Sequence, residues 1–380
     1  MKTDTLATDR DPIAFDRTPM VGLLDVPVRY DLAESTCPAL RLDEITGWDD
    51  IRGLSLDYGY VQGSPSLRSR IAEDHGADPQ DVILTAGSAG AMRLIAQDRC
   101  HGRTLLLTPC YPPARVVPEG LGSAIDRVAL RFDDGYRMPV DRIADALTPQ
   151  TTLVSVASPQ NPSGIRFQPG EFTDLLAAMA DRSPDAVLLV DETYRASSYG
   201  DAPIPESVAA MSPRVVACSS VSKAHGAPGL RLGWLVVTDH ALRDRLRNAK
   251  FAGEVASPSI DELLADRLLA RRQVVLRPRA EFLAEQLAEL VRWADGRPIE
   301  LLRPDGGALC CLRLPAAQFG EAAVRAFYAE LAERQTRVAP GSWFGEDDRV
   351  FRLGFGHLDA ADFTEALARL GEALSHSRGR

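Results

Sequence analysis

The chain has 380 residues, a formal net charge of −10 at pH 7 and six cysteines. This length is sufficient for one large domain and a smaller one, and the acidic balance argues against nucleic acid or an anionic membrane surface as the main partner. The sequence has no run of 18 apolar residues, so no membrane span is expected, and residues 1–29 lack a signal-peptide core, which predicts a cytoplasmic protein. The cysteines show no C-x-x-C spacing and the histidines form no ligand cluster, so we expect reduced thiols and no metal.

Seven short apolar runs alternate with helix-length segments or turns, and this alternation predicts an α/β fold with a mostly parallel seven-stranded sheet and helices on both faces. From about residue 240 an Arg/Leu/Ala/Glu-rich stretch predicts long helices that lead to a smaller α+β C-terminal domain, with a strand at 306–312 and a closing helix at 359–374. The predicted strands of the large sheet are 82–85, 104–108, 127–131, 152–157, 187–190, 215–219 and 232–238. The predicted units are an N-terminal segment packing with the small domain (1–47), a large cofactor-binding domain (48–245), a linking helix (246–275) and the small domain (276–380).

Small residues follow the first predicted strand, where the chain turns helical. Gly87, Ser88 and Ala89 let the backbone approach a ligand, and the free N–H groups of a helix start bind phosphate well. The segment matches neither G-x-G-x-x-G nor G-x-x-x-x-G-K-[ST], so a dinucleotide or nucleoside triphosphate is disfavoured. Tyr111 follows the next strand, where it can stack on an aromatic cofactor or simply pack against the protein.

Two further strands are followed by polar side chains. Asn161 lies in a turn fixed by two prolines and a glycine, so its amide can be a rigid donor to a ring oxygen; an ordinary Pro-rich turn is the alternative. Asp191 emerges at the carboxyl end of a buried strand, where open parallel sheets bind ligands, and it can pair with a protonated pyridine nitrogen. The alternative for Asp191 is a helix N-cap or a solvated acid. Tyr194 can direct its hydroxyl to the same ring oxygen as Asn161.

Lys223 closes a Ser-Val-Ser-Lys string that leads into a Gly-rich turn. Its amine can form a Schiff base with an aldehyde cofactor, while Ser220, Ser222 and Arg231 surround an anionic group. Taken alone, the string also fits a Gly/Ser-rich turn with a surface lysine. An ordinary lysine pKa is about 10.4, so it must fall if the amine is to act as a general base near neutrality. Imine formation and the positive charge of the cofactor can lower it.

In this order, the motifs resemble the class I/II aminotransferases, the aspartate-aminotransferase-like group of fold-type I enzymes dependent on pyridoxal 5′-phosphate (PLP). The resemblance runs from about Tyr30 to about Leu374. It implies PLP as the cofactor and an α-amino acid substrate, bound as an external aldimine that yields an α-carbanion. Lys223 is similar to the Schiff-base lysine and Asp191 to the partner of the pyridine nitrogen. The other implied cofactor contacts are Asn161 and Tyr194 at the ring oxygen, Tyr111 on the ring face, and Gly87, Ser88, Ala89, Ser220, Ser222 and Arg231 at the phosphate.

Two more positions resemble segments of that family. Tyr58 is similar to the tyrosine that reaches the phosphate of the neighbouring subunit, which implies a homodimer with shared active sites. Arg352 resembles the strand arginine that binds the substrate α-carboxylate, for which its planar fork is suited, alongside Asn161. A surface arginine is the alternative for Arg352.

The opening segment Tyr30–Pro38 resembles a subgroup rich in specialised metabolism, including arginine oxidases, capreomycidine-forming cyclases and enzymes acting on cysteine conjugates. Within it, Glu34 is a candidate contact for a substrate side chain or else a surface acid. His225 stands where many relatives carry an aromatic residue, so it is a candidate second acid/base or else a packed or surface histidine. Because the cofactor contacts are common to several reactions, we predict an aminotransferase, with a lyase, an oxidase (oxidative deamination, with or without decarboxylation) or a cyclase of secondary metabolism as the alternative.

Overall fold

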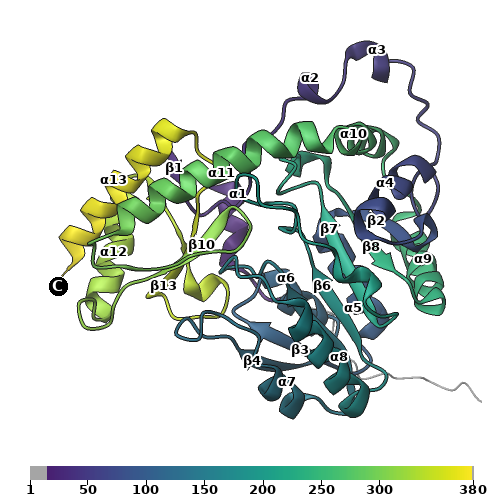
Figure 1. The fold of residues 1–380 in the computed structure, drawn as a ribbon, viewed down its shortest axis with the longest axis horizontal. Coiled ribbons are helices and arrows are strands. Elements are labelled where there is room, and N and C mark those ends of the chain that lie inside the picture. Colours follow the sequence, from purple (N-terminus) through teal and green to yellow (C-terminus); the bar gives the residue numbers. More distant parts are fainter. Residues whose placement is uncertain (1–14, 379–380) are drawn as a thin grey trace, which may run out of the picture.

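The computed structural model describes residues 15–378, and its largest element is a seven-stranded sheet of order β2-β8-β7-β6-β5-β3-β4 (Figure 1). Strand β8 runs antiparallel to both of its neighbours, while the other pairs are parallel. The predicted mostly parallel seven-stranded sheet is confirmed. The strands are β2 (Val82–Ala86), β3 (Arg103–Thr108), β4 (Ala124–Ala129), β5 (Thr151–Ala157), β6 (Val187–Asp191), β7 (Val215–Ser220) and β8 (Leu232–Val237).

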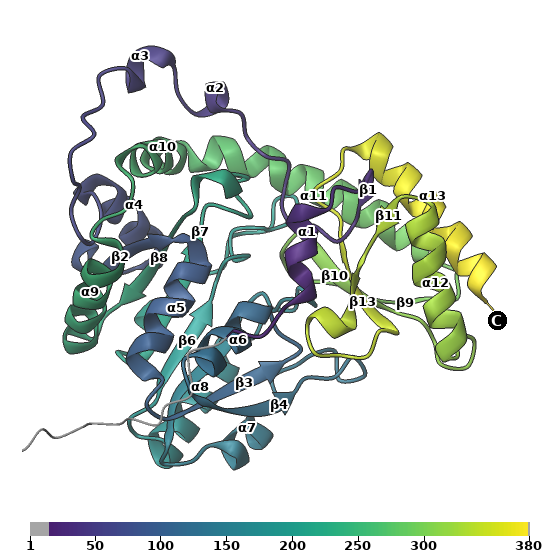
Figure 2. The same ribbon diagram turned by 180° about the vertical axis from the view of Figure 1, so that it is seen from behind.

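Helices cover both faces of this sheet. Side chains of successive strand residues point to opposite faces, and in this sheet both sets are apolar. On β6, Val187 and Leu189 belong to one buried cluster and Leu188 and Val190 to another. A parallel sheet that is apolar on both faces needs such a double cover (Figures 1 and 2). The first face carries α5 (Gly87–Arg99), α6 (Pro112–Gly120) and α9 (His240–Glu254), and the second carries α4 (Pro65–His75), α7 (Val140–Ala146), α8 (Pro169–Arg182) and α10 (Ser259–Ala270).

The C-terminal part is built on a four-stranded sheet of order β12-β13-β10-β9. The long helix α11 leads from the large sheet to this part (Figure 1). The buried core of the C-terminal part lies between the four-stranded sheet and the helices packed on it, and it includes Phe327, Phe351 and Phe363. The elements are α11 (Arg272–Ala294), β9 (Glu300–Leu302), β10 (Leu309–Arg313), α12 (Glu321–Glu333), β12 (Ala339–Pro340), β13 (Val350–Gly354) and α13 (Ala360–Ser377).

The N-terminal segment joins the C-terminal part before it enters the large one. Strand β1 (Tyr30–Asp31) pairs in parallel with β11 (Thr336–Arg337). The chain then passes through the short helices α2 (Leu42–Ile45) and α3 (Trp48–Ile51) on its way to α4, as Figures 1 and 2 show. The domain boundaries given above stay a prediction.

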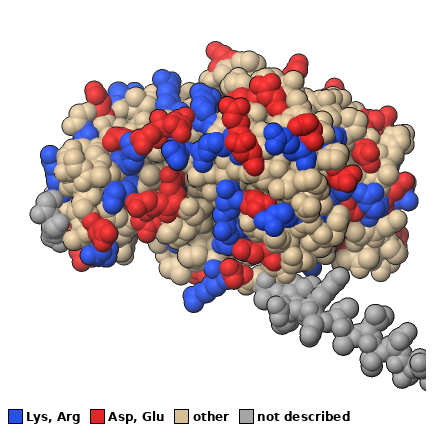
Figure 3. Space-filling model, turned by 90° about the horizontal axis from the view of Figure 1, so that it is seen from below, with Lys and Arg blue, Asp and Glu red and all other residues tan. Residues whose placement is uncertain are grey.

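Charged residues of both signs are interspersed on the face shown in Figure 3. All six cysteines are free thiols. Within residues 15–378, no helix is both long and apolar enough to cross a membrane, and no group of three His, Cys, Asp or Glu side chains is placed to hold a metal ion.

Candidate active site

The carboxyl ends of β3, β5, β6 and β7 lie at one edge of the large sheet, because these strands are parallel neighbours. Lys223 follows β7 at this edge. Its Nζ lies 3.1 Å from Glu34 Oε1 and 3.3 Å from Ser35 Oγ. Ser35 Oγ in turn lies 2.8 Å from the hydroxyl of Tyr194, which follows β6. Residues from the N-terminal segment and from the turn after β6 therefore lie around the lysine amine.

Glu34 reaches Lys223 because its segment lies directly against strand β13. The Gly354 N–H donates to the Leu32 carbonyl at 2.7 Å. A Cβ built on Gly354 would stand 1.7 Å from the Glu34 carbonyl oxygen, so no other residue fits there without movement of the backbone. This close approach fixes both Glu34 and Ser35 beside the lysine.

The charges in this group reinforce one another. Burial disfavours the ionised form of Glu34, but Lys223 and Arg352 outweigh it and place the Glu34 pKa at about 2. Burial likewise disfavours the ammonium form of Lys223, yet Tyr194 and Glu34 raise the Lys223 pKa above its ordinary value. General-base chemistry needs a lower pKa, so the lowering is left to the cofactor rather than to the side chains around it.

Asp191 ends β6 in the middle of the sheet, between β5 and β7, and is 7% exposed. Its Oδ1 accepts the Thr193 N–H at 3.0 Å and the Thr193 hydroxyl at 2.5 Å. Burial raises the Asp191 pKa, and the two hydrogen bonds from Thr193 oppose that rise. A carboxylate in this position is suited to pair with a protonated ring nitrogen.

An anion cradle lies where α5 begins. Residue Ala86 caps this helix with no side-chain hydrogen bond, so the first N–H groups of α5 are free for a ligand. A Cβ on Gly87 would stand 2.6 Å from Arg231 Nη2, which places the guanidinium against the helix start. Arg231 Nη1 also lies 3.4 Å from the hydroxyl of Ser222. The donors of this cradle suit a phosphate, and its predicted members are Gly87, Ser88, Ala89, Ser220, Ser222 and Arg231.

Arg352, on β13, and Asn161, in the turn after β5, meet directly. Arg352 Nη1 donates to Asn161 Oδ1 at 2.9 Å, and Nη2 donates to the Ala33 carbonyl at 2.6 Å. The Arg352 side chain is almost fully buried against the ring of Phe344, and its Nε has no hydrogen-bond partner among the described residues. An orphaned guanidinium donor of this kind fits a carboxylate ligand.

The remaining predicted residues fall into three different environments. Tyr111 is the N-cap residue of α6. Burial, together with the charges of Tyr194 and Asp191, raises the pKa of its phenol, and the charge of Lys223 opposes that rise. Tyr58 is 89% exposed on the surface of the single chain. His225 is buried and lines a separate cavity of about 540 Å³.

Burial, followed by the charges of three arginines, lowers the His225 pKa to about 4, with Asp74 opposing the shift. The cavity also contains Asp74, Arg195 and Arg272, and Asp74 forms ion pairs with both arginines. The surroundings of His225 therefore keep it neutral near pH 7.

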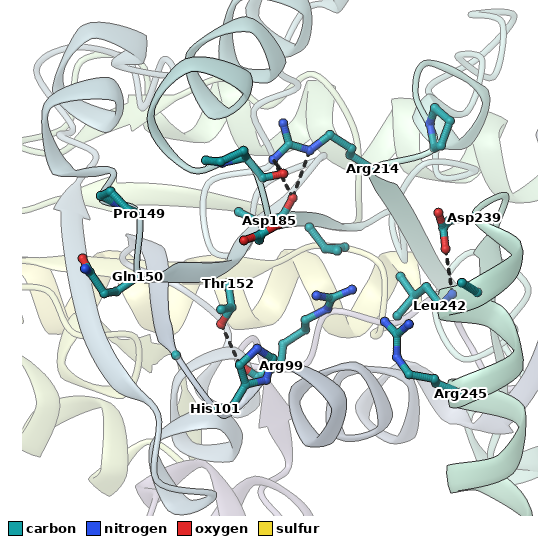
Figure 4. Close-up of a pocket in the computed structure, with 16 residues that line it drawn as sticks. Arg99, His101, Pro149, Gln150, Thr152, Asp185, Arg214, Asp239, Leu242 and Arg245 are labelled. Carbon is teal, nitrogen blue, oxygen red and sulfur yellow. Dashed lines mark hydrogen bonds between the residues drawn. The ribbon is translucent and has the colours of Figure 1, made fainter.

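A larger cavity, of about 720 Å³, lies at the opposite edge of the sheet, near the beginnings of β5 and β6 (Figure 4). Two of its arginines already have partners. Arg245 pairs with Asp98 at 2.8 Å, and Arg214 donates to the Ala186 carbonyl at 3.1 Å. Among the described residues that line this cavity, none is a predicted cofactor or substrate contact.

Sequence reasoning did not select Ser35 or Thr193 as site residues. Both stand inside motifs that were recognised, Tyr30–Pro38 and Asp191–Tyr194. A hydroxyl residue two positions after a strand-end acid is a signal for a local hydrogen bond to that acid. No comparable local signal existed for Ser35, because its partners are Tyr194 and Lys223, more than 150 positions away.

Comparisons with known proteins agree with this geometry. The family model for aminotransferase class I and II matches residues 29–370. Capreomycidine synthase from Streptomyces vinaceus is 28% identical over 350 residues, which cover 88% of this chain and 86% of that protein. The arginine–pyruvate transaminase AruH from Pseudomonas aeruginosa is 28% identical over 352 residues, which cover 87% of this chain and 86% of that protein.

Two solved structures have a similar fold. A PLP-dependent aminotransferase from Streptococcus suis superposes with a TM-score of 0.87 at 24% identity and covers 96% of this chain and 99% of its own. At that identity the likeness establishes the fold alone. The PLP-dependent cyclase OrfR superposes with a TM-score of 0.83 at 25% identity and covers 98% of this chain and 99% of its own.

Proposed function

The chain belongs to the class I and II aminotransferase family, a PLP-dependent family acting on amino acids, and we propose that it removes the amino group of an α-amino acid by transamination. One observation carries the proposal. Lys223, the acid Asp191 and an anion cradle stand together at the carboxyl edge of the large sheet. That set supplies an amine, a partner for a ring nitrogen and a phosphate site in one place.

When bound, PLP supplies an electrophilic carbonyl carbon and a ring that stabilises negative charge at the substrate α-carbon. Lys223 would bind that carbon through its amine and, once its amine is free, would take the proton from the substrate α-carbon. Asp191 would hold a proton on the ring nitrogen. Asn161 and Tyr194 would contact the ring oxygen, and Tyr111 would stack on the ring face.

Arg352 would bind the α-carboxylate of the substrate. Its guanidinium is already oriented by Asn161 and by the Ala33 carbonyl, so little side-chain freedom is lost when the substrate binds. Two parallel N–H donors match the two oxygens of a carboxylate. This contact would orient the α-carbon toward the amine of Lys223.

The position of Glu34 supports a second candidate function. This candidate is a lyase, oxidase or cyclase that acts on an arginine-like substrate or on a cysteine conjugate. The Glu34 charge is stabilised by Lys223 and Arg352. During turnover the lysine would be engaged with the cofactor or the α-proton and the arginine with the α-carboxylate. A cationic substrate side chain would then replace them as the partner of Glu34. Capreomycidine synthase among the relatives agrees with this candidate. The arginine–pyruvate transaminase agrees with an arginine-like substrate, but its reaction is that of the first candidate.

An amino-acid panel would separate the two candidates. Purified holoenzyme is mixed with single amino acids, arginine and cysteine conjugates included, without oxygen or keto acid, and its cofactor absorbance is followed. Transamination predicts one conversion per site, which stops until a keto acid is added. Product formed over many turnovers, or only once air is admitted, would reject transamination in favour of the second candidate. Lys223→Ala is the inactive control.

We also propose a homodimer that shares its active sites through Tyr58. Large apolar side chains are exposed near it, including Leu56, Tyr60 and Phe251, and such patches mark contact surfaces. Mixed dimers of Lys223→Ala and Tyr58→Ala subunits would test this, because each hybrid would contain one complete site. Random mixing should restore about a quarter of the wild-type activity. No recovery from two inactive parents would contradict shared sites. We also propose a cytoplasmic location and the domain boundaries given above.

A further inference from the structure

We propose that Thr193 is a positioning residue whose hydroxyl orients the Asp191 carboxylate, so that one carboxylate oxygen is left for the ring nitrogen of the cofactor. The inference rests on the role proposed above for Asp191. Thr193 touches no reacting atom in this assignment and acts only through the acid.

The geometry of the pair carries the inference. Thr193 donates twice to the same oxygen, through its N–H at 3.0 Å and its hydroxyl at 2.5 Å. A carboxylate oxygen has two lone-pair sites, so these two donors fill Oδ1 and fix the rotation of the group. Both residues are more than nine-tenths buried, so water does not compete for these bonds. Neither bond from Thr193 uses the second oxygen, Oδ2, so Oδ2 is the oxygen that we assign to the ring nitrogen.

The hydroxyl also affects the charge of Asp191. Burial raises the pKa of this acid, and the Thr193 side chain is the first of the groups that oppose the rise, followed by the Thr193 N–H and Cys218. A protonated Asp191 would no longer hold a proton on a ring nitrogen. The hydrogen bond from the Thr193 hydroxyl therefore favours the ionised form of Asp191 and also fixes the orientation of its carboxylate.

A purely structural role for Thr193 makes a different prediction. Hydroxyl residues often stabilise a turn after a strand-end acid, mainly through the backbone N–H. Thr193→Val keeps the shape of the side chain and that N–H while removing the hydroxyl. A turn residue would tolerate this change, whereas a positioning residue would not.

The test compares Thr193→Val and Thr193→Ser with the wild-type protein. Apoenzyme is titrated with PLP and with a carbocyclic analogue in which C–H replaces the ring nitrogen, and binding is followed by tryptophan fluorescence. Thr193→Val should bind PLP about tenfold to a hundredfold more weakly, because a hydrogen bond to a charged group is lost. The analogue, which cannot pair with Asp191, should bind both proteins equally, and Thr193→Ser should restore PLP affinity.

Loaded enzyme provides a second readout. Loss of the hydroxyl raises the Asp191 pKa, so the acidic limb of kcat should move to higher pH in Thr193→Val and return in Thr193→Ser. Thr104→Val, at the beginning of β3 and so at the other end of the strand from the candidate site, removes a buried hydroxyl that bonds Ser123 and should leave both readouts unchanged. Thr193→Ala replaces Thr193→Val if circular dichroism shows that the valine variant is unfolded.

Three results would overturn the inference. Equal weakening of PLP and the analogue would mean that Thr193 only packs. Unchanged PLP affinity and pH profile would mean that the hydroxyl is idle. If wild-type protein binds PLP and the analogue equally well, Asp191 is not the partner of the ring nitrogen, and the inference falls with it. If wild-type protein does not bind PLP at all, the proposed function itself is rejected.

Discussion

Replacement of Glu34 by glutamine should lower the pKa of Lys223 while preserving the shape of the site. The carboxylate oxygen lies 3.1 Å from Nζ, and the side chains are 24% (Lys223) and 15% (Glu34) exposed. Coulomb's law at this separation gives about 1.3 kcal/mol in water and about 5 kcal/mol at an effective dielectric constant of about 20. These energies correspond to roughly one to four pKa units. We therefore expect the Lys223 pKa to fall by at least about one unit.

The same substitution should also destabilise the protein in a pH-dependent way. The folded-state pKa of Glu34 is about 2, below its ordinary value, so the ion pair stabilises the fold above the ordinary pKa and loses this effect as the pH falls toward 2. The shift from an ordinary pKa of about 4.3 is worth about 3 kcal/mol. Glu34→Gln should therefore melt below the wild-type protein at pH 7, and the difference should narrow below about pH 4.

Competitive acylation measures the lysine directly. Cofactor-free enzyme is labelled with an acylating reagent across a pH series, and the modified Lys223 peptide is quantified by mass spectrometry. Glu34→Asp, which keeps a carboxylate, is the matched control and should remain close to wild type. Overlapping reactivity curves for Glu34→Gln and wild type would refute the assignment of Glu34 as the counter-ion of Lys223.

Three further substitutions test other contacts. Arg352→Lys keeps the charge but loses the planar fork, so kcat/KM for the amino acid should fall about a hundredfold, and steady-state kinetics with an unchanged kcat/KM would argue against a carboxylate role. Gly87→Ala puts a Cβ 2.6 Å from Arg231 Nη2 at a φ of +68°, so the Kd for PLP should rise about tenfold or more, whereas Gly170→Ala, whose Cβ meets nothing within 4 Å, should bind normally. Gly354→Ala should displace the Glu34 segment and lower the Lys223 pKa as Glu34→Gln does, and an unshifted acylation curve would show that the segment is not held by this approach.

Several features of the site were predictable because they depend on local sequence. Asp191 stands at the end of a buried strand, and Lys223 follows another, so a parallel sheet brings them to one edge whatever the rest of the chain does. The position of the anion cradle was predictable because small residues, beginning with Gly87, stand where a helix was predicted to start, and the free N–H groups of a helix start bind phosphate. Motif and strand order therefore indicated the cofactor and its edge of the sheet.

Other features depended on packing between distant segments. Glu34 was left open as a substrate contact or a surface acid, and it lies 189 positions before the lysine it contacts. His225 stands two positions after that lysine, yet it lines a separate cavity with Arg195 and Arg272. For neither residue does the separation along the sequence indicate the distance from the lysine amine in space.

By itself, the sequence determined the α/β fold, the parallel sheet and the family, because apolar periodicity and ordered motifs act over short stretches of chain. Only the tertiary structure decided which charges meet. Glu34 reaches Lys223 because the segment before Pro38 lies on β13, where a glycine at 354 leaves room for its backbone. Arg352, on β13, reaches Asn161, in the turn after β5, through a direct hydrogen bond between the two parts of the fold. Such contacts join segments between 150 and 320 positions apart, and no local pattern specifies them.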